Sequence, residues 1–127
     1  MNENATARQI VDAAYRVHTA LGPGLLESVY ESALAHELET KGLTFVRQHP
    51  VPVMYRGVQI QTAFYADLIV NDEVIVEIKA VETLAPVHKR QLLTYLRLTE
   101  KRLGLLINFN VLLIKDGITR IVNGLTS

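Results

Sequence analysis

The sequence predicts an α/β sandwich in which helices flank a mixed central β-sheet. Three observations carry this prediction. Apolar residues recur at helical spacing at the start of the chain and again over residues 86–102. The middle of the chain alternates between apolar and polar residues with a period of two, and a continuous apolar run follows at residues 104–114. The expected order is two helices, three strands, one helix and two strands.

The first two elements are predicted helices. Residues 4–21 place apolar side chains at helical spacing, and Gly22-Pro23-Gly24 ends this helix because proline and glycine interrupt regular backbone. A second helix is expected over residues 25–41, with Gly42 as its C-terminal cap. Its apolar side is formed by Leu26, Val29, Tyr30, Ala33, Leu34 and Leu38.

Three strands are expected next. Residues 43–55 and 58–70 pair around a turn at Arg56-Gly57, and residues 73–80 form the third strand. The two prolines of the first strand cannot donate to a ladder, so that strand lies at an edge of the sheet or is interrupted.

The last three elements complete the sandwich. A helix over residues 86–102 begins with Pro86, which suits a first helical turn. The apolar run at residues 104–114 predicts a strand that is buried on both faces. A turn at residues 115–117 then leads into a final strand over residues 118–123.

Composition restricts the function classes. The 127 residues are expected to form one domain over residues 1–127, and 49% apolar with 20% charged residues suits a packed globular protein. The absence of cysteine excludes disulfides and thiolate metal sites. No apolar run approaches the ~18 residues of a membrane span, and the polar start lacks a secretory signal, so a cytoplasmic location is expected. Zero net charge argues against non-specific gripping of a duplex but permits a local basic rim.

The hairpin formed by the second and third strands carries the most informative residues, Asp67, Glu77 and Lys79. If its turn is the three residues 71–73, Asp67 lies opposite Glu77, and Tyr65 lies opposite Lys79. A two-residue turn without a bulge would put the two acids on opposite faces. Facing carboxylates repel unless a cation lies between them. The hairpin therefore indicates a divalent metal and a phosphodiesterase site, whereas the alternative is a half-buried hairpin whose charges face solvent.

Two helices carry further candidates. Glu27 opens the second helix in line with Tyr30, Leu34 and Leu38, which directs it partly toward the apolar side; alternatively it favours the positive end of the helix dipole. Gln91 and Tyr95 share one face of the third helix, and their alternative is an ordinary surface beside a leucine core.

Basic and histidine residues give weaker signals. Arg90, Arg97 and Lys101 form one stripe of the third helix and are candidate substrate contacts, although a solvated helix face is the alternative. The four histidines show no ligand spacing, so no zinc site is predicted. His18 and His36 are expected on helix surfaces.

Four segments, GPGLLESVYESAL, YADLIVNDEVIVEIKAVE, QLLTYLRLT and GLLINFNV, together resemble the GxxExxY proteins, a compact branch of the PD-(D/E)XK nuclease superfamily. The resemblance runs from about Ala14 to Val122. The order Glu, Asp, Glu-x-Lys and Gln-x-x-x-Tyr is also similar to exonuclease domains of RecB type. One position departs from the family pattern: Tyr65 stands where a basic residue is common, which concerns substrate contacts rather than metal binding.

The resemblance implies a restriction-endonuclease-like sandwich and a Mg²⁺- or Mn²⁺-dependent nuclease. The metal ligands would be Asp67, Glu77 and the backbone carbonyl of Ile78, with Glu27 completing the acidic cluster directly or through water. Lys79 would assist the attacking water. The implied substrate is nucleic acid, with DNA favoured over RNA, and a homodimer is left open.

The remaining roles implied by the resemblance concern positioning and substrate contact. Gln91 would position Lys79 or the water, and Tyr95 would contact a flanking phosphate. Arg90 and Arg97 are further candidate substrate contacts because of their place in the basic stripe, not because of the resemblance. The alternative function is a catalytically silent module that binds nucleic acid or protein, and a third reading is a toxin-like or defence component that needs a partner chain.

Overall fold

The computed structural model describes residues 1–126, the side chain of residue 63 excepted, and shows a five-stranded sheet between two helical layers. The elements are α1 (Glu3–Leu21), α2 (Glu27–Thr40), β1 (Phe45–Tyr55), β2 (Val58–Val70), β3 (Val74–Lys79), α3 (Pro86–Thr99), β4 (Leu103–Asn108), the 3₁₀ helix η1 (Ile114–Gly117) and β5 (Ile118–Val122). The predicted order of helices and strands is confirmed. No helix within residues 1–126 is long and apolar enough to cross a membrane.

The sheet has the strand order β1-β2-β3-β4-β5. Every neighbouring pair is antiparallel except β3 and β4, which are parallel because α3 returns the chain to the starting end of the sheet. β1 lies at one edge, as its prolines predicted, and its register with β2 shifts twice. β4 is buried along its whole length, as its apolar sequence predicted.

Two apolar clusters hold the layers together. α1 and α2 cover one face of the sheet, where Ile10, Leu34 and Leu38 pack with the alternate β3 residues Val74, Val76 and Ile78. On the other face, Leu92 and Leu96 of α3 pack on Ile75 and Leu106. Gly104 permits this close approach, since a Cβ at that position would lie 3.0 Å from the Leu92 side chain. β3 is thus covered on both sides.

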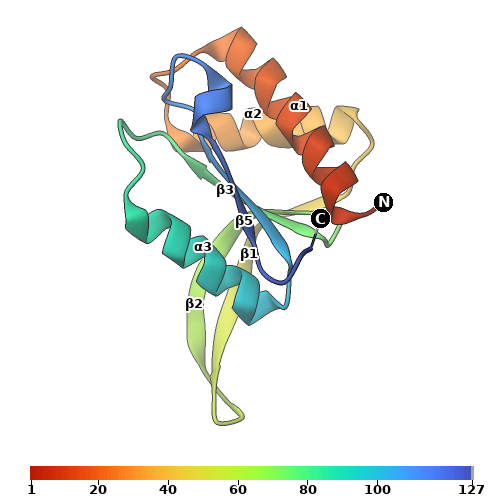
Figure 1. Cartoon of the computed structure of the whole chain (residues 1–127), viewed down its shortest axis with the longest axis vertical. Coiled ribbons are helices and arrows are strands. Elements are labelled where there is room, and N and C mark those ends of the chain that lie inside the picture. Colours follow the sequence, from red (N-terminus) through yellow and green to blue (C-terminus); the bar gives the residue numbers. More distant parts are fainter. Residues whose placement is uncertain (127) are drawn as a thin grey trace.

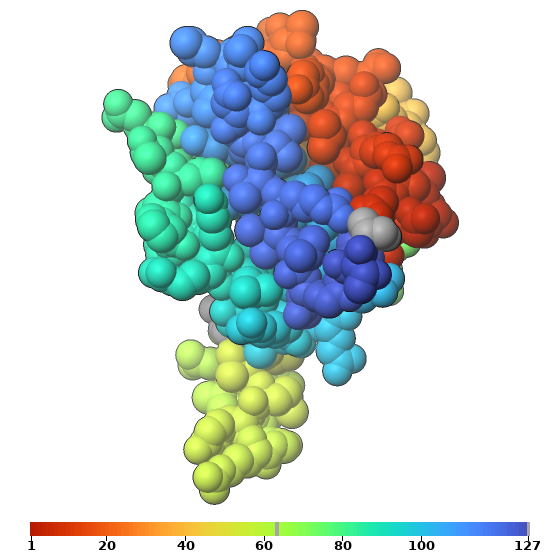
Figure 2. Space-filling view, viewed as in Figure 1, coloured from red at the N-terminus to blue at the C-terminus, as the bar shows by residue number. Residues whose placement is uncertain are grey.

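The hairpin of β1 and β2 extends well beyond the body of the molecule (Figures 1 and 2). Its base is part of the sheet, whereas its tip carries exposed apolar side chains, including Tyr55 and Ile60. Only the last part of β2 pairs with β3, from Leu68 to Val70.

The turn between β2 and β3 is the three-residue turn predicted. Val70 pairs with Val74, and the intervening residues 71–73 form the turn, with left-handed backbone at Asn71 and Asp72. Glu73 N donates to the Val70 carbonyl over 2.9 Å. The register continues through Leu68 opposite Val76, which directs Asp67 toward Glu77 on the same face of the sheet.

Two predicted ends are wrong. The strand expected over residues 104–114 stops at Asn108, and a bent segment leads into η1 instead of a simple turn. The chain doubles back tightly here, because a Cβ on Gly117 would collide with the Asn108 carbonyl at 2.1 Å. The helix expected to reach residue 102 ends at Thr99, where Glu100 adopts a left-handed conformation with φ 57°.

The prediction for His18 is also wrong. His18 is buried, and its Nε2 donates to the Val111 carbonyl over 2.8 Å. The reason is the early end of β4: the segment after Asn108 folds back over α1 rather than continuing as a strand. His36 is exposed, as predicted.

Candidate active site

The strands β2 and β3 separate at the point where the two acids lie. Their ladder ends at Leu68 opposite Val76. Beyond it, the backbone N–H of Ile78 donates to Oδ2 of Asp67 over 2.8 Å, so a side chain takes the place of the next ladder bond. The separation opens the edge of β3 toward a pocket.

Glu77 lies buried in this opening. Its side chain is only 7% exposed, and its Oε1 has no hydrogen-bond partner within residues 1–126. Burial, followed by the neighbouring charge of Asp67, raises the pKa of Glu77 from 4.5 to about 9, although Lys79 opposes part of this shift. The alternative in which these charges face solvent is therefore wrong for Glu77.

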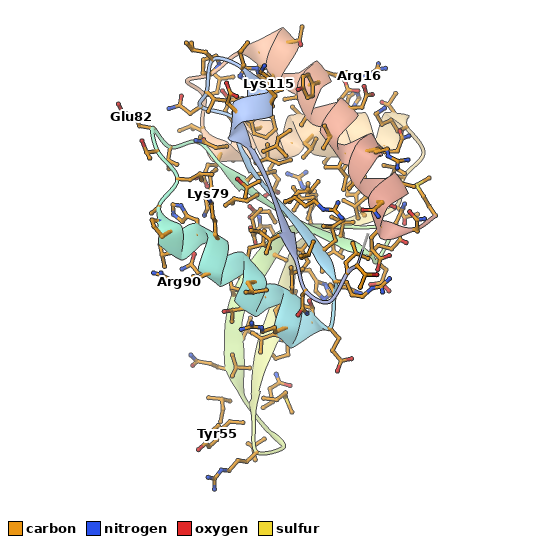
Figure 3. The ribbon with its side chains drawn as sticks, viewed as in Figure 1. Arg16, Tyr55, Lys79, Glu82, Arg90 and Lys115 are labelled. Atoms are coloured by element: carbon orange, nitrogen blue, oxygen red, sulfur yellow. The ribbon has the colours of Figure 1, made fainter. Side chains whose placement is uncertain are left out.

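Lys79 contributes the positive charge of the pocket. It is half-buried; its carbonyl accepts from the N–H of Phe109 over 2.9 Å, whereas its ammonium group forms no hydrogen bond or ion pair within residues 1–126. Figure 3 shows it between the end of β3 and the start of α3. Its ammonium group is therefore available to a ligand.

The spacing Gly24, Glu27, Tyr30 has a structural explanation. Gly24 has φ +101°, which favours glycine, and the hydroxyl of buried Tyr30 donates to the Gly22 carbonyl over 2.6 Å. The same hydroxyl accepts from the N–H of Leu25 over 3.1 Å. These contacts fix the turn before α2, so that Glu27, the first residue of the helix, reaches the end of β3.

Glu27 is exposed, yet its Oε1 accepts from the N–H of Ala80 over 3.3 Å. The expectation that it points partly toward the sheet agrees with this contact. Glu27 also lies at the positive end of α2. The two predictions for this residue, a direction partly toward the sheet and a favourable position at the helix dipole, are therefore compatible.

The opposite wall of the pocket comes from α3. Gln91 and Tyr95 both line it, so the face they share is the one turned toward the acids. Tyr95 stacks on Phe64 of β2 with ring centroids 3.3 Å apart. Partial burial, and then the charges of Glu77 and Asp67, raise the pKa of Tyr95, so its hydroxyl keeps its proton at neutral pH.

Together these groups enclose a small polar cavity of about 150 Å³. Its lining consists of Glu27, Tyr65, Asp67, Glu77, Lys79, His88, Gln91, Tyr95 and Leu106. Arg90 and Arg97 are exposed on α3 and do not line the cavity. The structure thus brings together the predicted acids, lysine, glutamine and tyrosine, and it leaves the two arginines outside.

Two residues at the site were missed from the sequence. His88 lines the cavity, and its Nδ1 accepts from the N–H of Ala85 over 3.2 Å. Its place three residues before Gln91, on the same helical face, is a signal that could have found it. Gln48, whose Nε2 donates to Oδ1 of Asp67 over 3.1 Å, gave no local signal, because it lies 19 residues away on another strand.

The site fits a divalent cation on chemical grounds. Within residues 1–126, no three groups among His, Cys, Asp and Glu are close enough to hold an ion by themselves. Mg²⁺, however, is commonly bound by one or two carboxylates and keeps several waters. The unpartnered oxygen of Glu77 beside the Asp67 carboxylate is the arrangement that a cation would relieve.

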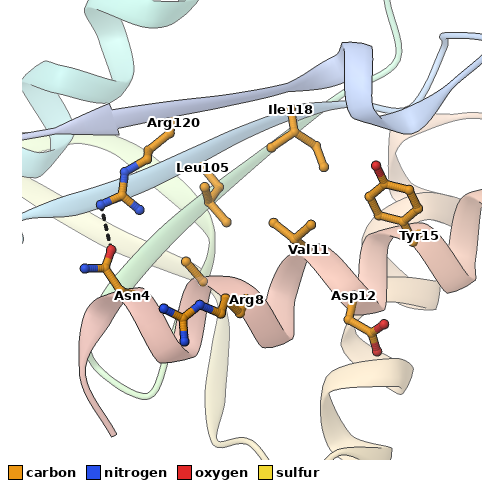
Figure 4. Close-up of a pocket in the computed structure, with 9 residues that line it drawn as sticks. Asn4, Arg8, Val11, Asp12, Tyr15, Leu105, Ile118 and Arg120 are labelled. Atoms are coloured by element: carbon orange, nitrogen blue, oxygen red, sulfur yellow. Dashed lines mark hydrogen bonds between the residues drawn. The ribbon is translucent and has the colours of Figure 1, made fainter. Parts of the chain in front are cut away.

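A larger groove lies elsewhere, between α1 and the strands β4 and β5, with a volume of about 680 Å³ (Figure 4). Its walls are mainly apolar, including Val11, Leu105 and Ile118. Its acid, Asp12, forms ion pairs with Arg16 and Lys41. This groove holds no unpaired carboxylate, and its size alone does not make it a reaction site.

A mixed sheet between α1–α2 and α3, with the acids and Lys79 where two strands separate, is the arrangement of the restriction-endonuclease-like fold. The chain belongs to the PD-(D/E)XK nuclease superfamily, whose profile matches residues 4–121. No curated protein and no solved structure matches the chain. The family assigns the class of a metal-dependent nuclease.

Proposed function

We propose that this protein hydrolyses phosphodiester bonds of nucleic acid with Mg²⁺ or Mn²⁺ held by Asp67 and Glu77. One observation carries the proposal: Glu77 is buried against a second carboxylate with one oxygen unpaired, in a chain of a nuclease superfamily. Without a cation Glu77 stays protonated at neutral pH, because its ionisation would leave a buried charge without a partner. A metal ion supplies that partner.

The ligand set follows from the edge of β3. The N–H of Ile78 points toward Asp67. Since the N–H and C=O of one strand residue point to the same side, the Ile78 carbonyl faces this side too. Asp67, Glu77 and this carbonyl are therefore the proposed ligands, and Glu27 joins directly or through water. When bound, the ion lowers the pKa of a coordinated water and offsets charge at the phosphate.

The other residues act on water and phosphate. Lys79 has a free ammonium group beside Glu77, so it would orient or help deprotonate the attacking water and offset charge at the scissile phosphate. Gln91 can orient that water or Lys79 through its amide. Tyr95, which keeps its proton, donates to a phosphate oxygen next to the reacting one. Arg90 and Arg97, which are exposed on α3 outside the cavity, would contact the nucleic acid at phosphates away from the scissile bond.

We also assign the chain to the GxxExxY branch. The support is the structural role of its motif: Gly24 and Tyr30 shape the turn that delivers Glu27 to the end of β3. DNA is the first substrate to test, because the order of the site residues resembles exonuclease domains of RecB type.

A second candidate is a catalytically silent module that binds nucleic acid. The observation that favours it is the position of Glu27, which contacts backbone at Ala80 and does not join the other acids in a three-carboxylate cluster. Such a module would retain the fold and lose turnover.

The deciding experiment incubates the protein with labelled single-stranded, duplex and branched DNA and with RNA, in Mg²⁺, Mn²⁺ or EDTA. We expect metal-dependent cleavage that Lys79→Ala reduces by about 10²–10⁴-fold, the usual contribution of a group that assists proton transfer. Glu39→Gln, at an exposed position on α2 away from the cavity, is the matched control. Binding without cleavage by the wild type in both metals would favour the silent module.

A further inference from the structure

Gln48 of β1 connects the site aspartate to a buried acid of α2. Its Nε2 donates to Oδ1 of Asp67 over 3.1 Å and to Oε1 of Glu31 over 2.6 Å. Both partners are carboxylates, which only accept when ionised, so the amide nitrogen must be the atom that faces them. One neutral side chain thus separates two acids and uses one N–H for each.

Glu31 is itself firmly held. Its side chain is largely buried, and its Oε2 accepts from Nε of Arg47 over 3.1 Å and forms an ion pair with the same guanidinium. Arg47 also donates to Oγ of Ser32 over 3.0 Å. Glu31 follows Glu27 by one helical turn, so α2 delivers one acid to the end of β3 and a second to the support of Asp67.

The backbone of Gln48 is strained in the conformation that makes these contacts. Its φ is +48°, in the left-handed region that residues with a Cβ rarely adopt. Strain of this kind persists where the surroundings over-determine it, and it gathers at functional sites. Here Asp67 and Glu31 are the groups that hold the side chain in place.

The result is an Asp67 carboxylate that cannot rotate freely. Oδ2 is held by the N–H of Ile78 and Oδ1 by Gln48. The orientation of this group toward Glu77 is therefore set by two elements distant in sequence, β3 and β1. Residues that hydrogen-bond to a metal ligand without binding the metal themselves orient that ligand and change the affinity for the metal.

We propose that Gln48, braced by Glu31 and Arg47, is a positioning residue that fixes the Asp67 carboxylate in the geometry needed for the cation. This inference rests on the proposed metal-dependent function. It adds supporting residues behind the site: Glu31 of α2 and Arg47 of β1 act through Gln48 and do not touch the substrate.

Two substitutions separate a positioning role from a structural one. Gln48→Leu keeps the size of the side chain and removes both donors, whereas Gln48→Gly removes the side chain and also relieves the left-handed strain. Mn²⁺ affinity is measured by calorimetry without nucleic acid, thermal unfolding is measured in EDTA, and kcat and KM are measured with the preferred substrate. Gln59→Leu, at an exposed amide on the same hairpin, is the control.

We expect both variants to bind Mn²⁺ about 10–100-fold more weakly, as is typical for loss of a hydrogen bond to a ligand. KM for nucleic acid should stay within about twofold, and kcat at limiting metal should fall. Gln48→Gly loses the hydrogen bond to buried Glu31 but relieves the left-handed backbone, so it should lose less stability than Gln48→Leu. Mn²⁺ affinity is therefore measured well below the unfolding temperature of each variant.

Wild-type Mn²⁺ affinity in a stable Gln48→Gly protein would overturn the inference and leave the nuclease proposal standing. If the wild type itself binds neither Mn²⁺ nor Mg²⁺, with or without nucleic acid, both proposals fall. If Gln48→Leu does not fold, Gln48→Gly alone decides between these outcomes.

Discussion

Two of the cavities of this protein differ in how their surroundings shift the pKa of an acid. In the groove between α1 and β5, hydrogen bonds from Lys41 and then Arg16 lower the pKa of Asp12, so this acid is satisfied by its neighbours. In the cavity at the end of β3, burial and a second carboxylate raise the pKa of Glu77. The groove is larger, yet of these two cavities it is the smaller that holds an acid whose ionisation is opposed by its surroundings. Opposed ionisation of a buried acid, rather than volume, is therefore the feature that distinguishes the proposed active site.

The strongest way to test this contrast is to remove a proposed ligand. Asp67→Asn should abolish metal binding and cleavage, a loss larger than the ~10–100-fold cost of an outer partner. In EDTA its unfolding temperature should also depend less on pH between 4.5 and about 9, because the charge that opposes ionisation of Glu77 is gone. Calorimetry with Mn²⁺ and thermal unfolding at several pH values give the two readings. Retained metal binding by a folded Asp67→Asn protein would contradict the contrast.

The pH dependence of stability should follow from Glu77. Its pKa is raised in the folded state, so its contribution is fully present below pH 4.5, and it is lost as the pH rises toward about 9. We therefore expect the metal-free protein to unfold at lower temperature as the pH increases through this range. Saturating Mn²⁺ should oppose the loss, because the metal binds the ionised form.

The control for that experiment is Glu77→Gln, which cannot ionise. Its unfolding temperature should lack this fall with pH and should respond little to Mn²⁺. An identical pH profile in the wild type and in Glu77→Gln would show that another group is responsible.

The groove should respond to substitution only through stability. Ile118→Ala removes part of a side chain that is partly buried against the α1–α2 cluster, so we expect a loss of about 1–2 kcal/mol in the free energy of unfolding. Cleavage per folded molecule should be unchanged. Urea unfolding and the nuclease assay measure the two quantities, and a large loss of kcat with intact stability would assign the groove a role in catalysis.

The smallest effect is expected for His88. It lines the small cavity, but its Nδ1 is occupied by the N–H of Ala85 at the start of α3. His88→Ala should lower kcat by less than about tenfold, well below the effect of Lys79→Ala, which is set by proton transfer. A loss equal to that of Lys79→Ala would make His88 a direct participant.

Local pattern was enough for much of this molecule. The order of the elements, the three-residue turn and the shared face of Asp67, Glu77 and Lys79 all follow from hydrophobic period and hairpin register. These features depend on residues close in sequence, where geometry is set by the backbone. The shared face of Gln91 and Tyr95 on α3, which is turned toward the cavity, is also determined by residues close in sequence.

Other features depended on contacts between distant segments. His18 was placed on a surface because its helix pattern permits it, but residues 109–113 fold over it. Gln48 looked like an ordinary residue of an edge strand. The two register shifts between β1 and β2 place it opposite Asp67, between the pairs Arg47–Leu68 and His49–Ala66. No period in the sequence encodes such a meeting.

The sequence by itself determined which groups the site contains, since spacing along two strands and two helices fixes which side chains share a face. The tertiary structure decided how far these groups are buried and how their pKa values shift. Two helical layers cover β3 on both faces, and this burial turns Glu77 from a surface acid into one with a pKa of about 9 and an unpaired oxygen. Desolvation is a property of the surroundings, so it arises only when the layers close around the strand.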